Sequence, residues 1–338
     1  MQEARYIIIF VVLSAVLAAC AMDRSLEKVH FVGQAQGTYY AITYYAVDGK
    51  NYQPSIDSLL EDFDKTASLW VESSMINRIN NNDDMQVNDV FVDLFNLSQE
   101  VAENSNGYFD MTVAPVVAAW GFGVDNQPQI KEGTVDSLLP LVNFRKVRLD
   151  GKNVVKDDPR IKFDFNGIAQ GYSVDMVAKF LESKGIENYL VDIGGEVYAS
   201  GRKPGRQRWK IGIEKPSDYQ YSSREINAEL PLTDQAVATS GNYRKYYEKN
   251  GVRYSHTIDP KTGRPVEHSL LSVTVIASSC AYADAYATAI MAMGLEDALL
   301  FIKEKQIGIE VYFIYSGENG NYKTLMTDGL RNILKEVG

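Results

Sequence analysis

Cysteine and histidine are scarce in this chain of 338 residues. Its two cysteines, Cys20 and Cys280, cannot build a disulfide framework or a CxxC metal knuckle. Its three histidines, His30, His256 and His268, argue against a multi-histidine zinc site. Basic residues are also fewer than acidic ones, with 34 Lys and Arg against 44 Asp and Glu and a net charge of −10. This acidic balance argues against a nucleic-acid partner.

Several motifs of common enzyme classes are missing as well. The chain contains no G-x-x-x-x-G-K-[ST] phosphate loop, no G-x-G-x-x-G after a strand, no G-x-S-x-G and no H-E-x-x-H. If the protein handles a nucleotide, it does so through another geometry. With 45% apolar and 23% charged residues, the composition is typical of a soluble globular protein, of one large domain or two ordinary ones.

The N-terminus carries an apolar run over residues 6–19, preceded by Arg5. The run is short for a bilayer core of about 30 Å and is typical of the h-region of an export signal. It ends in Leu17-Ala18-Ala19-Cys20, which resembles a bacterial lipobox. We therefore expect a lipoprotein signal peptide over residues 1–19, a short tether over 20–28 after lipidated Cys20, and one functional body over 29–338. The alternative is an uncleaved anchor helix, and in both cases the body is exported, tethered to a bacterial membrane and facing the periplasm.

The spacing of apolar residues predicts both helices and strands along the body. Helices are expected over residues 56–68, 90–105, 167–181, 281–293 and 296–305. Paired strands are expected over 30–47, and further strands over 161–165, 189–193, 209–213, 237–239, 254–258 and 271–276. Strands outnumber helices and often follow one another directly. The expected fold is therefore α+β, with largely antiparallel sheets and packed helices in a single compact body, rather than a doubly wound α/β fold.

Asp284 and Thr288 stand four residues apart on an expected helix, so their oxygens emerge from one face. A carboxylate and a hydroxyl are hard donors that suit Mg²⁺, which leaves room for phosphate oxygens and water. The structural alternative is that Asp284 only complements the helix dipole while Thr288 packs or bonds back to the backbone.

Two other segments carry groups suited to a site. Gly167 and Gly171 lie in a strand-to-helix transition, where backbone amides can face an anion or a carbonyl can face a metal, or where the glycines only permit tight packing. His256 lies before an Asp-Pro-x-x-Gly turn and could accept a proton from a hydroxyl near neutral pH, or could be a structural histidine. Aromatic residues over 107–112 could stack on a planar ring or belong to the core.

Taken in order, these segments resemble the ApbE family of FAD:protein FMN transferases, bacterial enzymes that are often exported lipoproteins. The likeness rests on Gly37-Thr38, Gly107-Tyr-Phe-Asp110, Trp120-Gly-Phe-Gly123, Gly171-Tyr-Ser-Val-Asp175, Gly194-Gly-Glu196, Thr239-Ser-Gly241, His256-Thr-Ile-Asp-Pro260 and Ala283-Asp-Ala-Tyr-Ala-Thr288. It spans nearly all of residues 29–338 and implies a flavin transferase domain with a fold related to the T-fold.

The resemblance implies that FAD is the substrate, that Mg²⁺ is the cofactor, and that FMN is moved as a phosphoester onto a Thr or Ser hydroxyl of a partner protein, releasing AMP. It implies Asp284 and Thr288 as metal ligands together with the carbonyl of Gly167, and His256 as the group that takes the acceptor's proton. The residues that it places along FAD are Gln36, Trp70, Tyr108, Phe109, Asp110, Asp164, Gln170 and Ile258. Many family members carry Met in place of Gln36 and a charged residue in place of Gln170.

The implied acceptors carry a D-x-x-[ST]-G-A-[TS]-like segment, as in quinone reductase or electron-transport subunits. The chain itself has no [ST]-G-A-[TS] segment, which favours modification of another protein. Two alternative functions would use the same predicted metal ligands. One is a Mg²⁺-dependent FAD pyrophosphatase that gives FMN and AMP, and the other is a non-catalytic FAD-binding lipoprotein.

Overall fold

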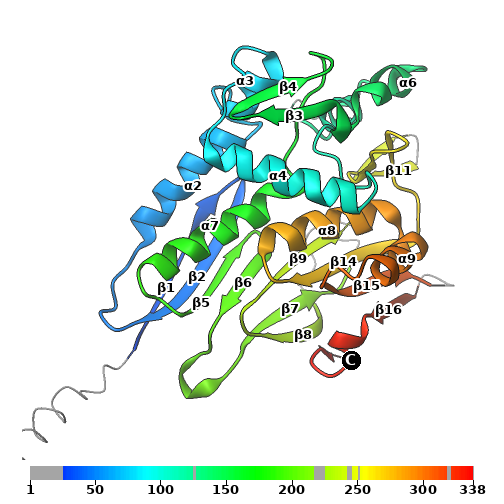
Figure 1. Ribbon diagram of the computed structural model, residues 1–338. Helices are drawn as coiled ribbons and strands as arrows, with labels where there is room; N and C mark the ends of the chain where they lie inside the picture. Colours follow the sequence, from blue (N-terminus) through cyan, green and yellow to red (C-terminus); the bar gives the residue numbers. More distant parts are fainter. Residues whose placement is uncertain are drawn as a thin grey trace, which may run out of the picture.

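The computed structural model describes residues 26–124, 127–216, 225–241, 246–249, 252–317 and 321–337. Its central element is an eight-stranded sheet in the order β1-β2-β5-β6-β9-β14-β15-β16 (Figure 1). These strands are β1 (Glu27–Ala35), β2 (Thr38–Ala46), β5 (Asn188–Ile193), β6 (Glu196–Ser200), β9 (Gln235–Gly241), β14 (Leu270–Ala277), β15 (Glu310–Ser316) and β16 (Tyr322–Met326). Neighbouring strands in this sheet are antiparallel, and the predicted α+β class with antiparallel sheets is confirmed.

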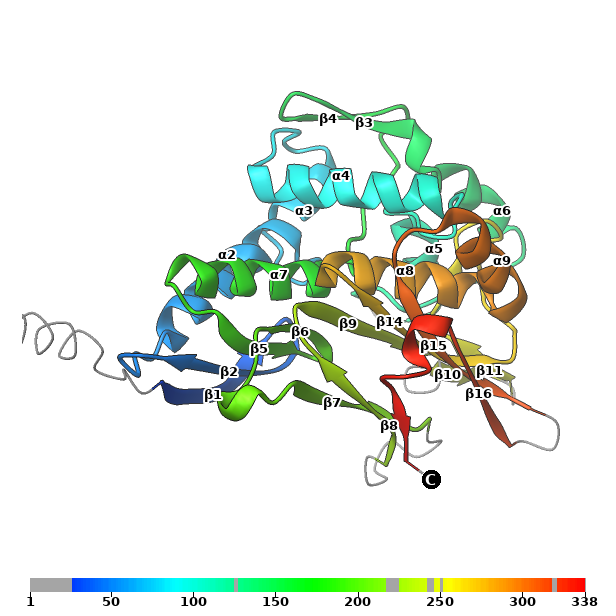
Figure 2. The ribbon, with the colours of Figure 1, turned by 60° about the horizontal axis from the view of Figure 1, so that its bottom comes forward.

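The sheet consists of two halves in which the sheet strands and one covering helix follow the same order, although other elements are inserted between them along the chain. In the first half, β1 and β2 are followed by helix α7 (Ala169–Ser183) and then by β5 and β6. In the second half, β9 and β14 are followed by helix α8 (Cys280–Met293) and then by β15 and β16. Figure 2 shows α7 and α8 end to end in one layer on the same face of the sheet. The two helices therefore meet where the two halves of the sheet join.

Further helices cover this layer. α2 (Gln53–Ala67) packs beside α7, and α4 (Asp89–Asn104) lies above α7 and α8, with the hairpin of β3 (Val147–Asp150) and β4 (Asn153–Lys156) beyond it (Figure 2). Other elements are α3 (Met75–Asn81), α5 (Ala114–Ala119), α6 (Thr134–Leu138), α9 (Leu295–Lys305), β10 (Tyr246–Lys249), β11 (Val252–Ser255), β12 (Ile258–Asp259), β13 (Arg264–Pro265) and short 3₁₀ turns at Leu139–Leu141, Phe144–Lys146, Pro204–Arg206 and Asp328–Leu330.

The middle strands of the large sheet, β9, β14 and β15, are largely buried on both faces, whereas one face of the edge strand β1 is exposed. The main core lies between the sheet and the helices that cover one of its faces, and α8 is almost wholly buried in this core. On the other face, Trp209, Leu230 and Tyr312 belong to a second core between the large sheet and a small sheet of β7 (Trp209–Glu214), β8 (Ile226–Leu232) and β17 (Lys335–Glu336). The alanines of α8 suit this place, because they favour a helix and let it lie close to the sheet. Burial on all sides holds α8 in a fixed position.

Two predicted strands are wrong. Residues 161–165 form no strand, although Ile161, Phe163 and Phe165 are buried. The side-chain amide of Asn80 replaces a strand partner here, since its Oδ1 accepts the Phe163 N–H at 2.6 Å and its Nδ2 donates to the Phe163 carbonyl at 2.9 Å. A single strand over 254–258 is likewise absent, because β11 ends at Ser255, whose Oγ accepts the Thr257 N–H at 3.1 Å in a turn.

The expected signal peptide, lipobox and tether fall mostly on residues 1–25, which lie outside the described residues. Within the described part of the chain, no helix combines the length and apolar character that a bilayer crossing needs.

Candidate active site

Asp284 and Thr288 lie one turn apart on α8, facing the loop that leads into α7. Thr288 Oγ1 lies 3.5 Å from the carbonyl oxygen of Gly167 and donates to it. The Asp284 Oδ2 accepts the N–H of Gly171 at 3.0 Å. The structure thus brings together the three residues predicted as metal ligands, at the place where the N-terminal turns of α7 and α8 meet.

The close approach depends on Gly167. A Cβ at this position would lie 3.1 Å from Thr288 Cγ2 and 3.2 Å from both Thr288 Oγ1 and Phe109 Cε2. No described residue donates a hydrogen bond to Asp284 Oδ1, so this oxygen is available to a ligand. A carboxylate, a hydroxyl and a carbonyl oxygen fit Mg²⁺, which takes few protein ligands beside water and phosphate oxygens. The described residues contain no group of three or more His, Cys, Asp or Glu that could hold a metal, so this single-carboxylate set differs from a carboxylate cage.

Burial dominates the electrostatics of Asp284. It raises the pKa of this carboxyl to about 7, the N–H of Gly171 acts in the opposite direction, and the charge of Asp175 raises the pKa further. The ionised form therefore lacks a nearby compensating cation. A divalent ion bound to Asp284 would supply that compensation and favour release of the proton.

His256 lies between β11 and β12 and is partly buried. Its ring meets Phe122 edge to face, with centroids 6.4 Å apart and an interplanar angle of 72°. The turn that follows is tied to the end of α5, because Trp120 Nε1 donates to the Gly263 carbonyl at 2.8 Å. Ile258 packs in a small buried cluster with Trp120. Since β12 contacts α8, His256 lies next to a segment that packs against the helix of Asp284 and Thr288.

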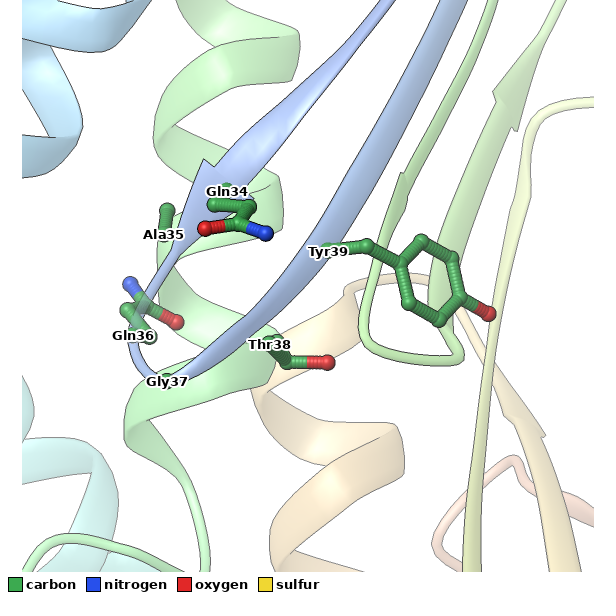
Figure 3. Close-up of a pocket in the computed structure, with 6 residues that line it drawn as sticks. All are labelled: Gln34, Ala35, Gln36, Gly37, Thr38 and Tyr39. Carbon is green, nitrogen blue, oxygen red and sulfur yellow. The ribbon is translucent and has the colours of Figure 1, made fainter.

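Of the two predicted glutamine contacts, Gln36 lies in the β1–β2 turn and Gln170 lies in the first turn of α7. Gln36 occupies the β1–β2 turn with φ 54°, and this hairpin lines an open cavity of ≈ 540 Å³ (Figure 3). Its Oε1 accepts from Ser173 Oγ at 3.2 Å, while its Nε2 is buried without a partner. Gln170 Nε2 donates to the carbonyl of Ile193 at 2.7 Å and lies against Gly194. The Gln36 amide thus offers a donor that a ligand could satisfy.

Tyr108 and Phe109 lie on opposite sides of a turn after α4. Phe109 is buried against Gly167, while the Tyr108 hydroxyl donates to Asp297 Oδ2 at 2.7 Å. The Lys261 ammonium lies 3.5 Å from the centroid of the Tyr108 ring. Neither Lys261 nor Asp297 was among the residues predicted for the site, and only the position of Lys261 in the turn after His256 could have suggested it.

Asp164 and Trp70 have contrasting surroundings. Asp164 is buried, which raises its pKa, and its Oδ1 accepts the Asn166 N–H at 2.7 Å, shaping the turn before Gly167. Trp70 lies in the loop between α2 and α3 and is 58% exposed. The side chain of Asn77 holds this loop by donating to the carbonyls of Leu69 and Val71, both at 2.9 Å. The flavin contacts of Asp164 and Trp70 stay predictions.

Asp110 has a structural role that its sequence motif did not reveal. Its Oδ1 accepts from the Thr112 N–H at 2.8 Å and from Thr112 Oγ1 at 2.6 Å, and its Oδ2 accepts the Phe144 N–H at 2.9 Å. Burial raises the pKa of this carboxyl, and these hydrogen bonds lower it. Its predicted contact with FAD would have to use the remaining lone pairs.

We expect Asp110→Ala to lower the free energy of unfolding by about 3 kcal/mol, because it leaves three buried donors without an acceptor. Denaturant unfolding of the ligand-free protein measures this change. Asp136→Ala, on an exposed position of α6, is the control and should cost less than about 1 kcal/mol. Stability equal to that of the control would contradict the structural role.

Comparisons with known proteins agree with the fold. The model of the ApbE family matches residues 36–313. The FAD:protein FMN transferase of Vibrio cholerae is 36% identical over 308 residues, which cover 88% of this chain and 91% of that protein. The enzyme of the same name from Escherichia coli K12 is 31% identical over 326 residues, covering 93% of this chain and 91% of that protein.

Solved structures give the same result. The flavin transferase ApbE from Vibrio cholerae superposes with a TM-score of 0.80 at 34% identity, covering 91% of this chain and 99% of the other. The apo form of the flavinyl transferase ApbE from Pseudomonas stutzeri gives a TM-score of 0.81 at 30% identity, covering 91% of this chain and 97% of the other.

The chain with this antiparallel α+β fold is thus a transferase enzyme, as the sequence predicted. The chain is a member of the ApbE family.

Proposed function

We propose that this protein is a Mg²⁺-dependent FAD:protein FMN transferase, which moves FMN from FAD onto a Thr or Ser hydroxyl of a partner protein and releases AMP. The names of its relatives support flavin transfer. The observation that carries the proposal is the approach of Thr288 Oγ1 to the Gly167 carbonyl, beside the buried Asp284.

Asp284, Thr288 and the Gly167 carbonyl would hold the Mg²⁺ ion, which when bound neutralises charge on the diphosphate of FAD. The acceptor hydroxyl forms a bond to the phosphorus on the FMN side, and the bond from this phosphorus to the bridging oxygen breaks. The hydroxyl proton passes to His256, and AMP carries away the bridging oxygen. The chain contributes mainly placement and charge, as in other phosphoryl transfers.

Residues around the pair would orient FAD. The unpaired Gln36 Nε2 is suited to a carbonyl acceptor of a flavin ring, and Tyr108 and the exposed Trp70 have faces on which a ring could stack. Phe109, Asp110, Asp164, Gln170 and Ile258 would line the same path from more buried positions.

An assay with FAD, Mg²⁺ and an acceptor domain carrying a D-x-x-[ST]-G-A-[TS]-like segment tests the proposal. A fluorescent acceptor band supports transfer. Free FMN and AMP with an unlabelled acceptor would indicate FAD pyrophosphatase activity, and unchanged FAD would indicate a binding protein.

We also propose that the enzyme acts at a membrane surface. Lipidation of Cys20 would anchor the enzyme to a bacterial membrane on the periplasmic side, with acceptors among quinone reductase or electron-transport subunits. Metabolic labelling with a fatty-acid analogue, compared between the wild type and Cys20→Ser, measures the anchor directly.

We expect His256→Ala to reduce flavin transfer by at least about 100-fold while leaving FAD affinity nearly unchanged, because general-base help is lost and the binding groups remain. The transfer assay gives the first quantity, and flavin fluorescence titration gives the second. His30→Ala is the matched control, since His30 is exposed and bonded to Thr43 on β2. Wild-type transfer by His256→Ala would refute the proton-acceptor role.

A further inference from the structure

The N-terminal turns of α7 and α8 are joined by hydrogen bonds that run in both directions. The first N–H groups of any helix lack partners within the helix. In α7, the N–H of Gly171 is taken by Asp284 Oδ2 of α8 at 3.0 Å. In α8, the N–H groups of Cys280 and Ala281 are taken by Asp175 Oδ1 and Oδ2 of α7, at 2.8 and 2.9 Å. Each helix therefore lends a carboxylate to the N-terminus of the other.

The arrangement is reciprocal in spacing as well. Gly171 and Asp175 are four residues apart on α7, and Cys280 and Asp284 are four residues apart on α8. In each helix the amide lies in the first turn and the carboxylate lies one turn further on. The contact is tight, since a Cβ on Gly171 would lie 2.3 Å from the Cys280 carbonyl oxygen. The relative position of the two helices is thus set by direct contact and by three hydrogen bonds.

Asp175 is not required merely to start α8. Ser279 is the N-cap of this helix, and its side chain accepts the N–H of Tyr282 at 3.3 Å. The carboxylate of Asp175 is buried, and it spans two further amides from a different helix. Its geometric effect is therefore on the placement of α8 against α7 rather than on helix formation alone.

That placement decides whether the metal ligands converge. Asp284 and Thr288 belong to α8, whereas the Gly167 carbonyl belongs to the loop entering α7. Mg²⁺ needs oxygens at about 2.0–2.1 Å in near-octahedral geometry, so a shift of about 0.5 Å between the helices would spoil the set.

We propose that Asp175 is a positioning residue for the metal site, which fixes the N-terminus of α8 so that Asp284 and Thr288 face the Gly167 carbonyl. The inference rests on the proposed function for the identity of the ligands. Asp175 is not one of the proposed metal ligands, and its carboxylate holds the backbone of Cys280 and Ala281.

Binding of Mn²⁺, a hard ion that replaces Mg²⁺ at oxygen sites, tests this role without measuring turnover. The loss of the free-ion EPR signal on titration of the full protein in the presence of FAD gives a Kd for Mn²⁺. We expect Asp175→Ala to raise this Kd by about 10- to 100-fold, as for other groups that orient metal ligands. Asp175→Asn keeps one acceptor oxygen and should raise it less, by about 3- to 10-fold.

Tyr172→Phe is the matched control. It removes another hydrogen bond of α7, from the Tyr172 hydroxyl to Asp93 of α4 at 3.0 Å, without touching α8. This variant should bind Mn²⁺ as the wild type does, even if its melting temperature falls. FAD affinity without metal should be unchanged in all three variants, which a general loss of structure would not allow.

The outcomes are distinct. A Kd within about twofold of wild type in Asp175→Ala overturns the positioning role, and Asp175→Asn decides by the same criterion if the alanine variant does not fold. If the wild type binds Mn²⁺ and Asp284→Ala does not, the assignment of Asp284 as a metal ligand is supported, whatever Kd is measured for Asp175→Ala. If the wild type fails to bind Mn²⁺ with FAD, both the metal site and the role of Asp175 fall.

Discussion

Replacement of Asp284 by asparagine should reduce flavin transfer at least about 100-fold and, in the metal-free protein at pH 8, raise the melting temperature. Activity falls because the single carboxylate of the oxygen set is lost. Stability rises because burial lifts the pKa of Asp284 from its ordinary 3.8 to about 7. Above pH 7 the folded protein therefore carries a desolvated negative charge that an amide does not have.

The pH dependence follows from the direction of this shift. A carboxyl with a raised pKa binds its proton more tightly in the folded state, so it lowers stability as the pH rises from about 4 to about 7. The cost at pH 8 is at most about 4 kcal/mol in the absence of metal. We expect the difference in melting temperature between Asp284→Asn and the wild type to be largest at pH 8 and to shrink at pH 5.

Thermal unfolding at both pH values, with and without Mg²⁺, measures these effects. Mg²⁺ should raise the melting temperature of the wild type at pH 8 but not that of Asp284→Asn, because only the former binds it. Asp93→Asn is the control, since Asp93 is exposed and should show wild-type activity. Full turnover by Asp284→Asn would exclude the metal assignment.

Gly171→Ala should disrupt both stability and activity. Its new Cβ would lie 2.3 Å from the Cys280 carbonyl oxygen, 2.7 Å from the Cys280 carbonyl carbon and 2.8 Å from Asp284 Cβ. Two of these atoms are backbone and cannot rotate away, so α7 and α8 must separate. We expect a loss of about 3 kcal/mol in unfolding free energy, larger than the helix-propensity gain of about 1 kcal/mol. Transfer activity should fall at least about 100-fold, since separation moves Asp284 from the Gly167 loop.

Gly151→Ala provides the control for Gly171→Ala. Gly151 lies in the β3–β4 turn with φ +59°, and a Cβ there meets nothing within 4 Å. This variant should lose about 1 kcal/mol from backbone strain and keep wild-type transfer. Denaturant unfolding and the transfer assay are measured on both proteins. Gly171→Ala with the activity of Gly151→Ala would show that the helices tolerate separation.

Local sequence patterns predicted most of the elements that carry the site. The spacing of Ile56, Leu60 and Phe63 marks α2, and the separation of Asp284 from Thr288 placed both on one helical face, as the structure has them. These features depend on periodicity over a few residues, which a single sequence displays.

Contacts between distant side chains and backbone groups could not be predicted in the same way. Asn80 hydrogen-bonds to the backbone of Phe163, 83 residues further on, in place of a neighbouring strand. The strand predicted over 161–165 therefore does not form. Asp175 reaches the amide of Cys280 across 105 residues, and Asp110 reaches that of Phe144 across 34. A buried carboxylate that binds the backbone cannot be distinguished by residue type from one that binds a ligand, which is why Asp110 was assigned only to FAD.

The matching order of elements in the two halves of the sheet bears on how such a site can arise and be assembled. One unit of two strand pairs and a helix supplies the Gly167 carbonyl, just before α7, and the other supplies Asp284 and Thr288, so neither unit contains the full set. During synthesis, the Gly171 N–H at the N-terminus of α7 cannot bond to Asp284 until the last third of the polypeptide has been made. The candidate ligand set is therefore complete only where the two similar units meet, and we expect a fragment that encodes either unit alone to be inactive until it binds its complement.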